Sequence, residues 1–123
     1  MVFATPLESV PHLQSGRLRA LAVTGTRRLK VMADLPTIAE SGVQGYEVSQ
    51  WYGVLAPVGT PPQVLVALNR AFVQALRSPD LVDRFAKDGV DLVGSTPDQF
   101  RNHIDAEIKR FKVAITAAGI KLD

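Results

Sequence analysis

The sequence contains no cysteine, which excludes disulfide bonds, thiolate catalysis and cysteine-based metal sites. It has only two histidines, His12 and His103, without paired spacing, so a zinc or iron site is not expected. No apolar run of about 18 residues occurs, so no membrane span is predicted. An excess of one charge is also missing, because 14 basic residues nearly balance 12 acidic ones and leave a net charge of +2. We therefore expect no metal and no other cofactor.

Recognisable catalytic patterns are missing as well. There is no G-x-S-x-G nucleophile motif and no glycine loop that would cradle a phosphate. The closest acids, Asp105 and Glu107, stand two apart on a predicted helix and point to different faces. The basic cluster Arg27, Arg28 and Lys30 lacks interleaved aromatic residues and is interpreted as a solvated loop. We expect a protein that is not an enzyme and has no nucleic-acid partner.

Helices are predicted where a capping residue and a proline precede apolar side chains at helical spacing. The segments expected to be helical are residues 6–14, 36–40, 61–76, 79–88 and 97–118. Pro11 lies inside the first of them, so that helix is expected either to be kinked or to begin at Pro11. Thr60–Gln63 and Thr96–Gln99 both have the spacing of a capping box. The last helix carries the clearest apolar stripe, and this stripe needs a partner surface: Phe100, Ile104, Ile108, Phe111 and Ile115.

Apolar segments between the helices are predicted to be strands. They are residues 1–4, 17–24, 46–60 and 90–93. A continuous apolar strand after a helix, as in residues 17–24, is typical of a parallel sheet covered on both faces. Residues 46–60 form the longest segment and hold the only tryptophan, Trp51, which is either a core residue or lies beside a ligand cleft. Gly53 in the same segment indicates close approach of another backbone or of a ligand. The pattern indicates an α/β fold.

Three blocks of the sequence closely resemble the C-terminal half of the Bug family. They are SGRLRALAVTGTRR, DLPTIAESGVQGYEVSQWYGVLAPVGTP, and STPDQF with EIKRFKVAITAAGIKLD. Members of this family are solute-binding receptors of the tripartite tricarboxylate transporter type. The resemblance runs over nearly the whole chain. It implies part of a type II periplasmic-binding-protein fold, a three-layer α/β/α arrangement, that lacks the N-terminal lobe.

In such receptors two α/β lobes close on a small carboxylate. The resemblance implies that residues 1–45 are part of lobe two, residues 46–60 are the hinge crossover strand, and residues 61–123 return to lobe one. The implied function is an extracytoplasmic receptor for a di- or tricarboxylate or an acidic amino acid, with a membrane permease as partner. The implied location is periplasmic, although the opening residues MVFATPLES do not have the pattern of a signal peptide.

Ligands of open α/β sheets bind at the carboxyl ends of strands. Two predicted strand ends fit this rule, Ala4–Thr5 and Thr24, and the resemblance implies that the first lies nearest the ligand. Both threonines offer hydroxyl and backbone N–H donors that suit a carboxylate. Thr5 is also explained as a helix cap, and Thr24 as an ordinary strand end. The predicted ligand-binding residues are Ala4, Thr5, Thr24 and Trp51.

A second hypothesis assigns the chain to another class. Without a first lobe, the apolar faces of residues 64–76 and of the last helix would lack their usual partner. Such a chain would act as a self-associating or interaction module without ligand binding, and a homo-oligomer would be one way to cover these faces.

Overall fold

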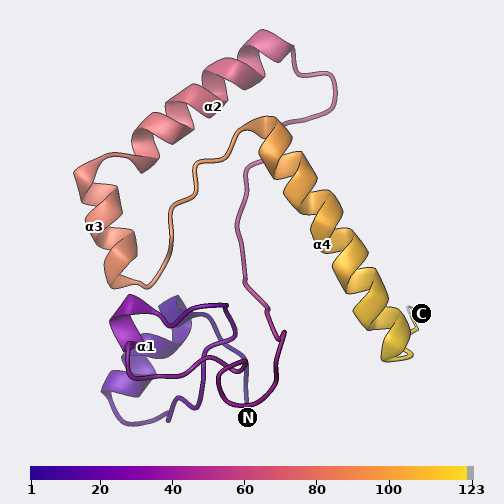
Figure 1. The fold of residues 1–123 in the computed structure, drawn as a ribbon. Coiled ribbons are helices and arrows are strands. Elements are labelled where there is room, and N and C mark those ends of the chain that lie inside the picture. The colour runs from indigo at the N-terminus through magenta and orange to yellow at the C-terminus, as the bar shows by residue number, and fades with distance from the viewer. Residues whose placement is uncertain (122–123) are drawn as a thin grey trace. The chain divides into compact units, whose positions relative to one another are not determined.

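The computed structural model describes residues 1–121 and is helical over four of the five segments predicted to be helical (Figure 1). The α-helices are α1 (Pro6–Gln14), α2 (Pro62–Leu76), α3 (Pro79–Lys87) and α4 (Pro97–Ala117), and η1 (Lys30–Met32) is a short 3-10 helix. The predicted helices at 6–14, 61–76, 79–88 and 97–118 are therefore confirmed to within one residue at each end.

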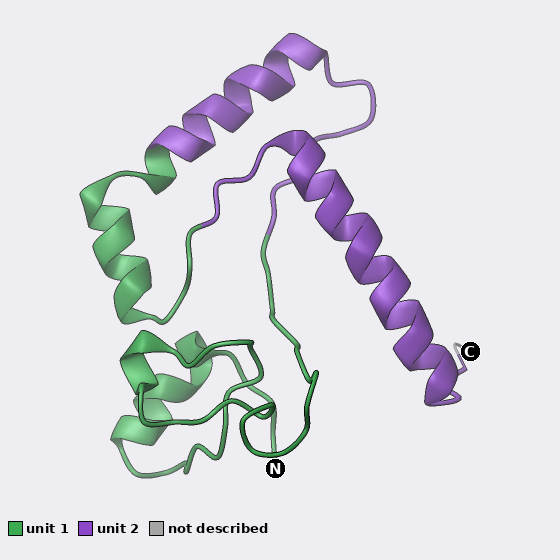
Figure 2. Ribbon diagram, viewed as in Figure 1, with its two compact units in different colours: residues 1–52, 75–92 green, residues 53–74, 93–123 purple. Residues whose placement is uncertain are grey.

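The chain divides into two compact units, coloured separately in Figure 2. Unit 1 contains residues 1–52 and 75–92, and therefore holds α1, η1 and α3. Unit 2 contains residues 53–74 and the residues from 93 onward, and therefore holds most of α2 and all of α4. The two units are described separately below.

The capping box that the sequence predicts forms at α4 but not at α2. Thr96 Oγ1 accepts from the Gln99 N–H at 3.2 Å, and Gln99 Oε1 accepts from the Thr96 N–H at 2.9 Å, which completes the predicted capping box. Helix α2 instead begins at Pro62, so Thr60 lies before the N-cap position. Its hydroxyl donates to the Pro57 carbonyl at 2.8 Å, and the capping box predicted there does not form.

Helix α1 runs unbroken from Pro6 to Gln14 with Pro11 inside it, so it does not begin at Pro11. It ends at the C-cap Ser15, and Gly16 follows with a φ of 71°. This left-handed conformation is the one that glycine adopts readily after a helix, as the Ser15-Gly16 pair indicates.

The predicted strands do not pair. Among the described residues the only β-type pairing is one isolated parallel bridge between Val23 and Thr37. Its two hydrogen bonds, from Val23 N–H to the Pro36 carbonyl and from Ile38 N–H to the Val23 carbonyl, are both 2.9 Å. The strands predicted at 1–4, 17–24, 46–60 and 90–93 are therefore wrong as ladder-forming strands within residues 1–121. An apolar pattern favours extended backbone, but a strand also needs a neighbouring backbone to bond with.

The longest predicted strand is an extended connection with few partners. Residues 46–57 contain no helix in Figure 1. Their described backbone bonds within unit 1 run from Tyr46 N–H to the Val43 carbonyl at 3.1 Å and from Val48 N–H to the Thr24 carbonyl at 2.9 Å. A turn then closes the segment, in which Thr60 N–H donates to the Pro57 carbonyl at 3.2 Å. The Pro/Gly turn that the sequence indicates at this point is present.

Burial within the described residues is concentrated at the bridge. Thr37 is 2% exposed and Val23 is 9% exposed, and no other residue in the described part of the chain is classed as buried. On the α4 stripe, Phe100 and Ile104 are half-buried, while Ile108 is 60% exposed. The apolar helix faces that are predicted to pack against a partner surface are thus largely exposed within residues 1–121.

Candidate functional site

Residues 37–41 form a hydrogen-bonded turn that follows the bridge, so the helix predicted for residues 36–40 is wrong. Glu40 N–H donates to Thr37 Oγ1 at 3.0 Å, and Thr37 N–H donates to Glu40 Oε2 at 2.8 Å. Ser41 adds bonds from its N–H and its hydroxyl to the Thr37 carbonyl, at 3.1 and 2.8 Å. These bonds have the pattern of a capping box, but Thr37 is held in the bridge and the segment stays a single turn.

Arg28 joins this turn from the neighbouring bend. Its Nε donates to Glu40 Oε2 at 3.0 Å, and one terminal nitrogen donates to the Ala33 carbonyl at 3.3 Å. Both partners of the ion pair are about half-exposed. The backbone N–H of Thr37, then the Arg28 guanidinium, hold the pKa of the Glu40 carboxyl below its ordinary value of 4.5.

The pattern of the sequence does not indicate this pair. It predicts a solvated loop at Arg28 and the end of a helix at Glu40. The spacing from Thr37 to Glu40 is the same Thr-x-x-Glu/Gln spacing seen in the other capping boxes, and it was a usable signal. The partner Arg28 lies 12 residues before Glu40, so sequence spacing gives no indication of the contact.

Thr24 lies directly after the bridge, at the end of the extended segment. Its carbonyl accepts from Val48 N–H, and Gly25 lies against Ser49, whose Oγ is 3.8 Å from the position of a Cβ built on Gly25. The structure therefore brings Thr24 beside the residues that precede Trp51. Trp51 itself is 41% exposed, so it is not buried within the described residues.

Thr5 serves as the cap of α1. Its Oγ1 accepts from the Glu8 N–H at 3.3 Å, and its hydroxyl and N–H donate to Glu8 Oε2 at 3.0 and 3.2 Å. A carboxylate ligand would have to replace the Glu8 carboxylate at these donors. Ala4 precedes the cap and is exposed. The described bonds of Thr5 stay within the first turn of α1 and with Ser9, so they do not connect it to Thr24.

Gly53 is the point of close approach that the sequence indicates, but the neighbour is a side chain. In unit 2 a Cβ on Gly53 would lie 2.0 Å from Cζ of Phe100 and 2.7 Å from its Cε1. The aromatic ring from the first turn of α4 fills the space that the missing Cβ leaves. The expected approach of another backbone or of a ligand is thus replaced by the Phe100 ring.

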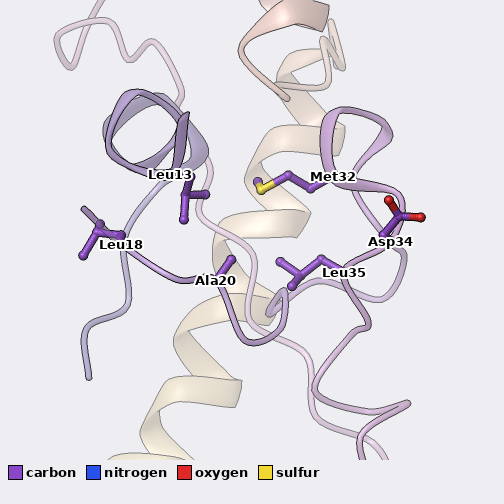
Figure 3. A pocket seen from close by; sticks show the side chains of 6 residues that line it. All are labelled: Leu13, Leu18, Ala20, Met32, Asp34 and Leu35. Carbon is purple, nitrogen blue, oxygen red and sulfur yellow. The ribbon is translucent and has the colours of Figure 1, made fainter. Parts of the chain in front are cut away.

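A hollow in unit 1 lies apart from these residues (Figure 3). It is open, has a volume of about 420 Å³, and is lined by Leu13, Leu18, Ala20, Met32, Asp34 and Leu35. Its walls are apolar, and its one charged group is a carboxylate, which repels anions. It contains none of the predicted ligand-binding residues, and its chemistry fits an apolar side chain rather than a small acid.

Neither a metal-binding cluster nor a membrane-spanning helix occurs within residues 1–121. No group of three or more His, Asp or Glu side chains is arranged to hold a metal ion within that range. None of the described helices is long and apolar enough to cross a membrane. In unit 1, Thr24 and Gly25 are half-buried, Thr26 and Arg27 are exposed, and Trp51 is 41% exposed.

Comparison with known proteins gives matches over nearly the whole chain. Residues 1–120 match the tripartite tricarboxylate transporter family receptor. Protein BugT of Bordetella pertussis is 40% identical over 125 residues, covering 98% of this chain and 38% of BugT. A UPF0065 protein from the tcbD-tcbE intergenic region of a Pseudomonas species is 37% identical over 105 residues, covering 85% of this chain and 31% of that protein.

Solved structures of similar proteins match at the level of the fold. Rpa4515 of R. palustris, solved with adipate, has a TM-score of 0.85 and 38% identity over 93% of this chain and 38% of that protein. The periplasmic binding protein BugD has a TM-score of 0.85 and 29% identity over 92% of this chain and 38% of BugD. This chain therefore has the fold of part of a periplasmic-binding α/β protein and spans 38% of the length of each.

Proposed function

This chain belongs to the tripartite tricarboxylate transporter receptor family, and we propose that it forms part of an extracytoplasmic receptor for a small carboxylate. The observation that carries the proposal is the family match over residues 1–120. The likeness to Rpa4515, solved with adipate, supports a dicarboxylate as the class of ligand. The likeness to BugD, a periplasmic binding protein, supports a periplasmic location.

The proposed site uses Ala4, Thr5, Thr24 and Trp51, all of which belong to unit 1. Thr24 supplies a hydroxyl at the end of the segment that is fixed by the Val23 bridge. Trp51 supplies an apolar face for the methylene chain of a dicarboxylate. The backbone at Ala4 and Thr5 supplies hydrogen-bond donors when the Glu8 carboxylate is displaced from the Thr5 N–H. A second lobe would supply the remaining contacts.

Residues 46–60 are proposed to act as the hinge crossover between lobes. The boundary between unit 1 and unit 2, at Tyr52 and Gly53, lies inside this segment and supports the assignment. We assign residues 1–45 to lobe two and residues 61–123 to the part that returns to lobe one. The contact-based units differ for residues 75–92, which group with unit 1.

The proposed mechanism is binding without catalysis. A carboxylate that contacts both lobes binds the closed form more tightly than the open form, and so shifts the equilibrium toward closure. A membrane permease would then recognise the closed shape. No acid, base or nucleophile is required for such a cycle.

The site assignment is tested by titrating the ¹⁵N-labelled chain with adipate and following backbone amide shifts by NMR. We expect changes at Ala4, Thr5, Thr24 and Trp51, and none with the neutral diamide of the same length. Thr24→Val, which keeps the side-chain shape and removes the hydroxyl, should weaken the response. Changes confined to the hollow near Leu18, or equal responses to acid and diamide, would contradict the assignment.

The second candidate function is self-association without ligand binding. The observation that favours it is the exposure of large apolar side chains, including Leu21 at 63%, Val54 at 68% and Ile108 at 60%. Monomeric soluble proteins rarely leave extensive apolar patches uncovered, and a second copy of the chain is one partner that would cover them.

Light scattering combined with thermal melting separates the two functions. A monomer whose melting temperature rises with adipate supports the receptor. A dimer whose melting temperature rises with protein concentration and ignores adipate supports self-association. In that case Ile108→Asp on the apolar stripe of α4 should return the dimer to a monomer, whereas Asp98→Ala on the exposed surface of the same helix should not.

A further inference from the structure

The residues on either side of the bend at residues 24–27 are both hydrogen-bonded to the turn at residues 37–40. At the first end, Val23 forms the parallel bridge with Thr37, through two hydrogen bonds of 2.9 Å. At the second end, Arg28 binds Glu40 through Nε at 3.0 Å. Thr37 and Glu40 are themselves joined by two reciprocal bonds, so the two fastening points form one rigid unit.

The Glu40 carboxylate is the point where these restraints meet. Its Oε2 accepts from the Thr37 N–H at 2.8 Å and from Arg28 Nε at 3.0 Å. Arg28 makes a further bond to the Ala33 carbonyl, which limits rotation of the guanidinium. The lowered pKa of Glu40 follows from the same contacts.

The bend itself has few other supports. The Thr24 carbonyl accepts one bond from Val48 N–H, and Arg27 pairs with Asp91. Both side chains of the Arg27–Asp91 pair are more than two-thirds exposed, so solvent screens their attraction. The Val23 bridge and the Arg28–Glu40 pair are therefore the two restraints that enclose the bend on either side.

We infer that Glu40 and Arg28 are positioning residues, which hold the bend at residues 24–27 in one conformation so that Thr24 is presented to a carboxylate ligand. The inference rests on the proposed function for its ligand, and on the contacts above for its geometry. Neither side chain touches the ligand. Their effect is to remove the conformational freedom that the bend would otherwise lose on binding, and a preorganised site binds more tightly for that reason.

The geometry of the guanidinium matters as well as its charge. Arg28 uses two different nitrogens for Glu40 and for Ala33, and a lysine ammonium on a flexible stem does not reproduce this fixed fork. Arg28→Lys should therefore behave like Arg28→Ala in this respect. Arg28 and Glu40 share one contact, and each also makes a bond outside it, to Ala33 and Thr37 respectively. Arg28→Ala combined with Glu40→Gln should therefore loosen the bend by less than the sum of the two single changes.

The inference is tested by ¹⁵N relaxation of the labelled chain without ligand. In Glu40→Gln and Arg28→Ala we expect the heteronuclear NOE to fall at Gly25, Thr26 and Arg27, with the amides of α4 unchanged. The matched control is Arg101→Ala, which removes an ion pair of the same 3.0 Å length on the exposed surface of α4. It should leave residues 24–27 as ordered as in the unmodified chain.

Unchanged order at residues 24–27 in both variants would overturn the inference, and so would an equal loss of order along the whole chain. A fully ordered bend in Arg28→Lys would overturn the geometric part. An adipate titration followed at Thr24 forms the second arm, where Glu40→Gln should weaken the apparent affinity severalfold. If the unmodified chain shows no adipate response, the proposed function fails, while the relaxation result still decides the positioning role.

Discussion

At the scale of single residues, close packing limits which side chains a position can hold, and Gly53 is the clearest example. The aromatic ring of Phe100 occupies the volume that any side chain at position 53 would need, since three ring carbons lie within 2.8 Å of the Cβ position. The sequence alone indicated a close approach at Gly53. It did not identify the neighbour, because Phe100 lies far along the chain and contacts at such separation leave no local pattern.

Gly53→Ala is expected to destabilise unit 2 by about 1–3 kcal/mol, the usual cost of overpacking a filled site. The added Cβ would force the Phe100 ring out of its position. Gly25→Ala is the matched control, because the nearest atoms to its Cβ position lie at 3.8 Å, an ordinary contact distance. Thermal melting followed by circular dichroism should show a lower midpoint for Gly53→Ala only. Equal midpoints for both variants would contradict the packing described here.

Glu40 predicts how the turn at residues 37–40 responds to pH. Its pKa is lowered, so its contribution to the turn is fully present above the ordinary value of 4.5 and is lost as pH falls through the lower folded value. An NMR titration of the Thr37 amide should therefore have a midpoint below 4.5. Arg28→Ala removes one of the two bonds and should move that midpoint upward. A midpoint at or above 4.5 in the unmodified chain would be inconsistent with the contacts of Oε2.

At the scale of elements, the four α-helices were predictable, whereas the predicted strands and the predicted helix at residues 36–40 were wrong. The caps at Thr5 and Thr96 and the apolar stripe of α4 are local features, and these helices form where the sequence places them. A paired strand depends on a second segment at any distance along the chain. Residues 17–24 and 46–60 have the side-chain pattern of strands, yet within residues 1–121 only Val23 and Thr37 form a bridge. Side-chain patterning therefore predicted backbone conformation but not hydrogen-bond partners.

The helix caps provide a prediction with an internal control. Thr96→Ala removes the acceptor for the Gln99 N–H and should destabilise α4 by about 1 kcal/mol. Ser78 occupies the N-cap of α3, but its side chain makes no cap bond and donates instead to the Ala75 carbonyl. Ser78→Ala should therefore cost α3 less. Amide hydrogen exchange in the first turn of each helix measures both effects, and a larger loss in α3 would argue against this difference.

At the scale of the whole molecule, the fold was predicted from the resemblance to a known family and not from the pairing of predicted strands. The family match over residues 1–120 and the TM-scores of 0.85 confirm part of a periplasmic-binding fold. The candidate site is predicted less completely. Thr24 lies beside the residues that lead to Trp51, whereas Thr5 is engaged by Glu8. The positioning pair Arg28–Glu40 depends on a tertiary contact, and was visible only in the three-dimensional structure.

The central claim is that this chain supplies one side of a carboxylate site in a two-lobed receptor. The most direct measurement is calorimetry of adipate binding to a chimera, in which the matching segment of Rpa4515 is replaced by this chain. We expect the chimera to bind adipate, and Thr24→Val to lower the affinity about tenfold or more, because a hydrogen bond to a charged group is lost. A chimera that melts cooperatively but binds neither adipate nor any other small di- or tricarboxylate would contradict the account.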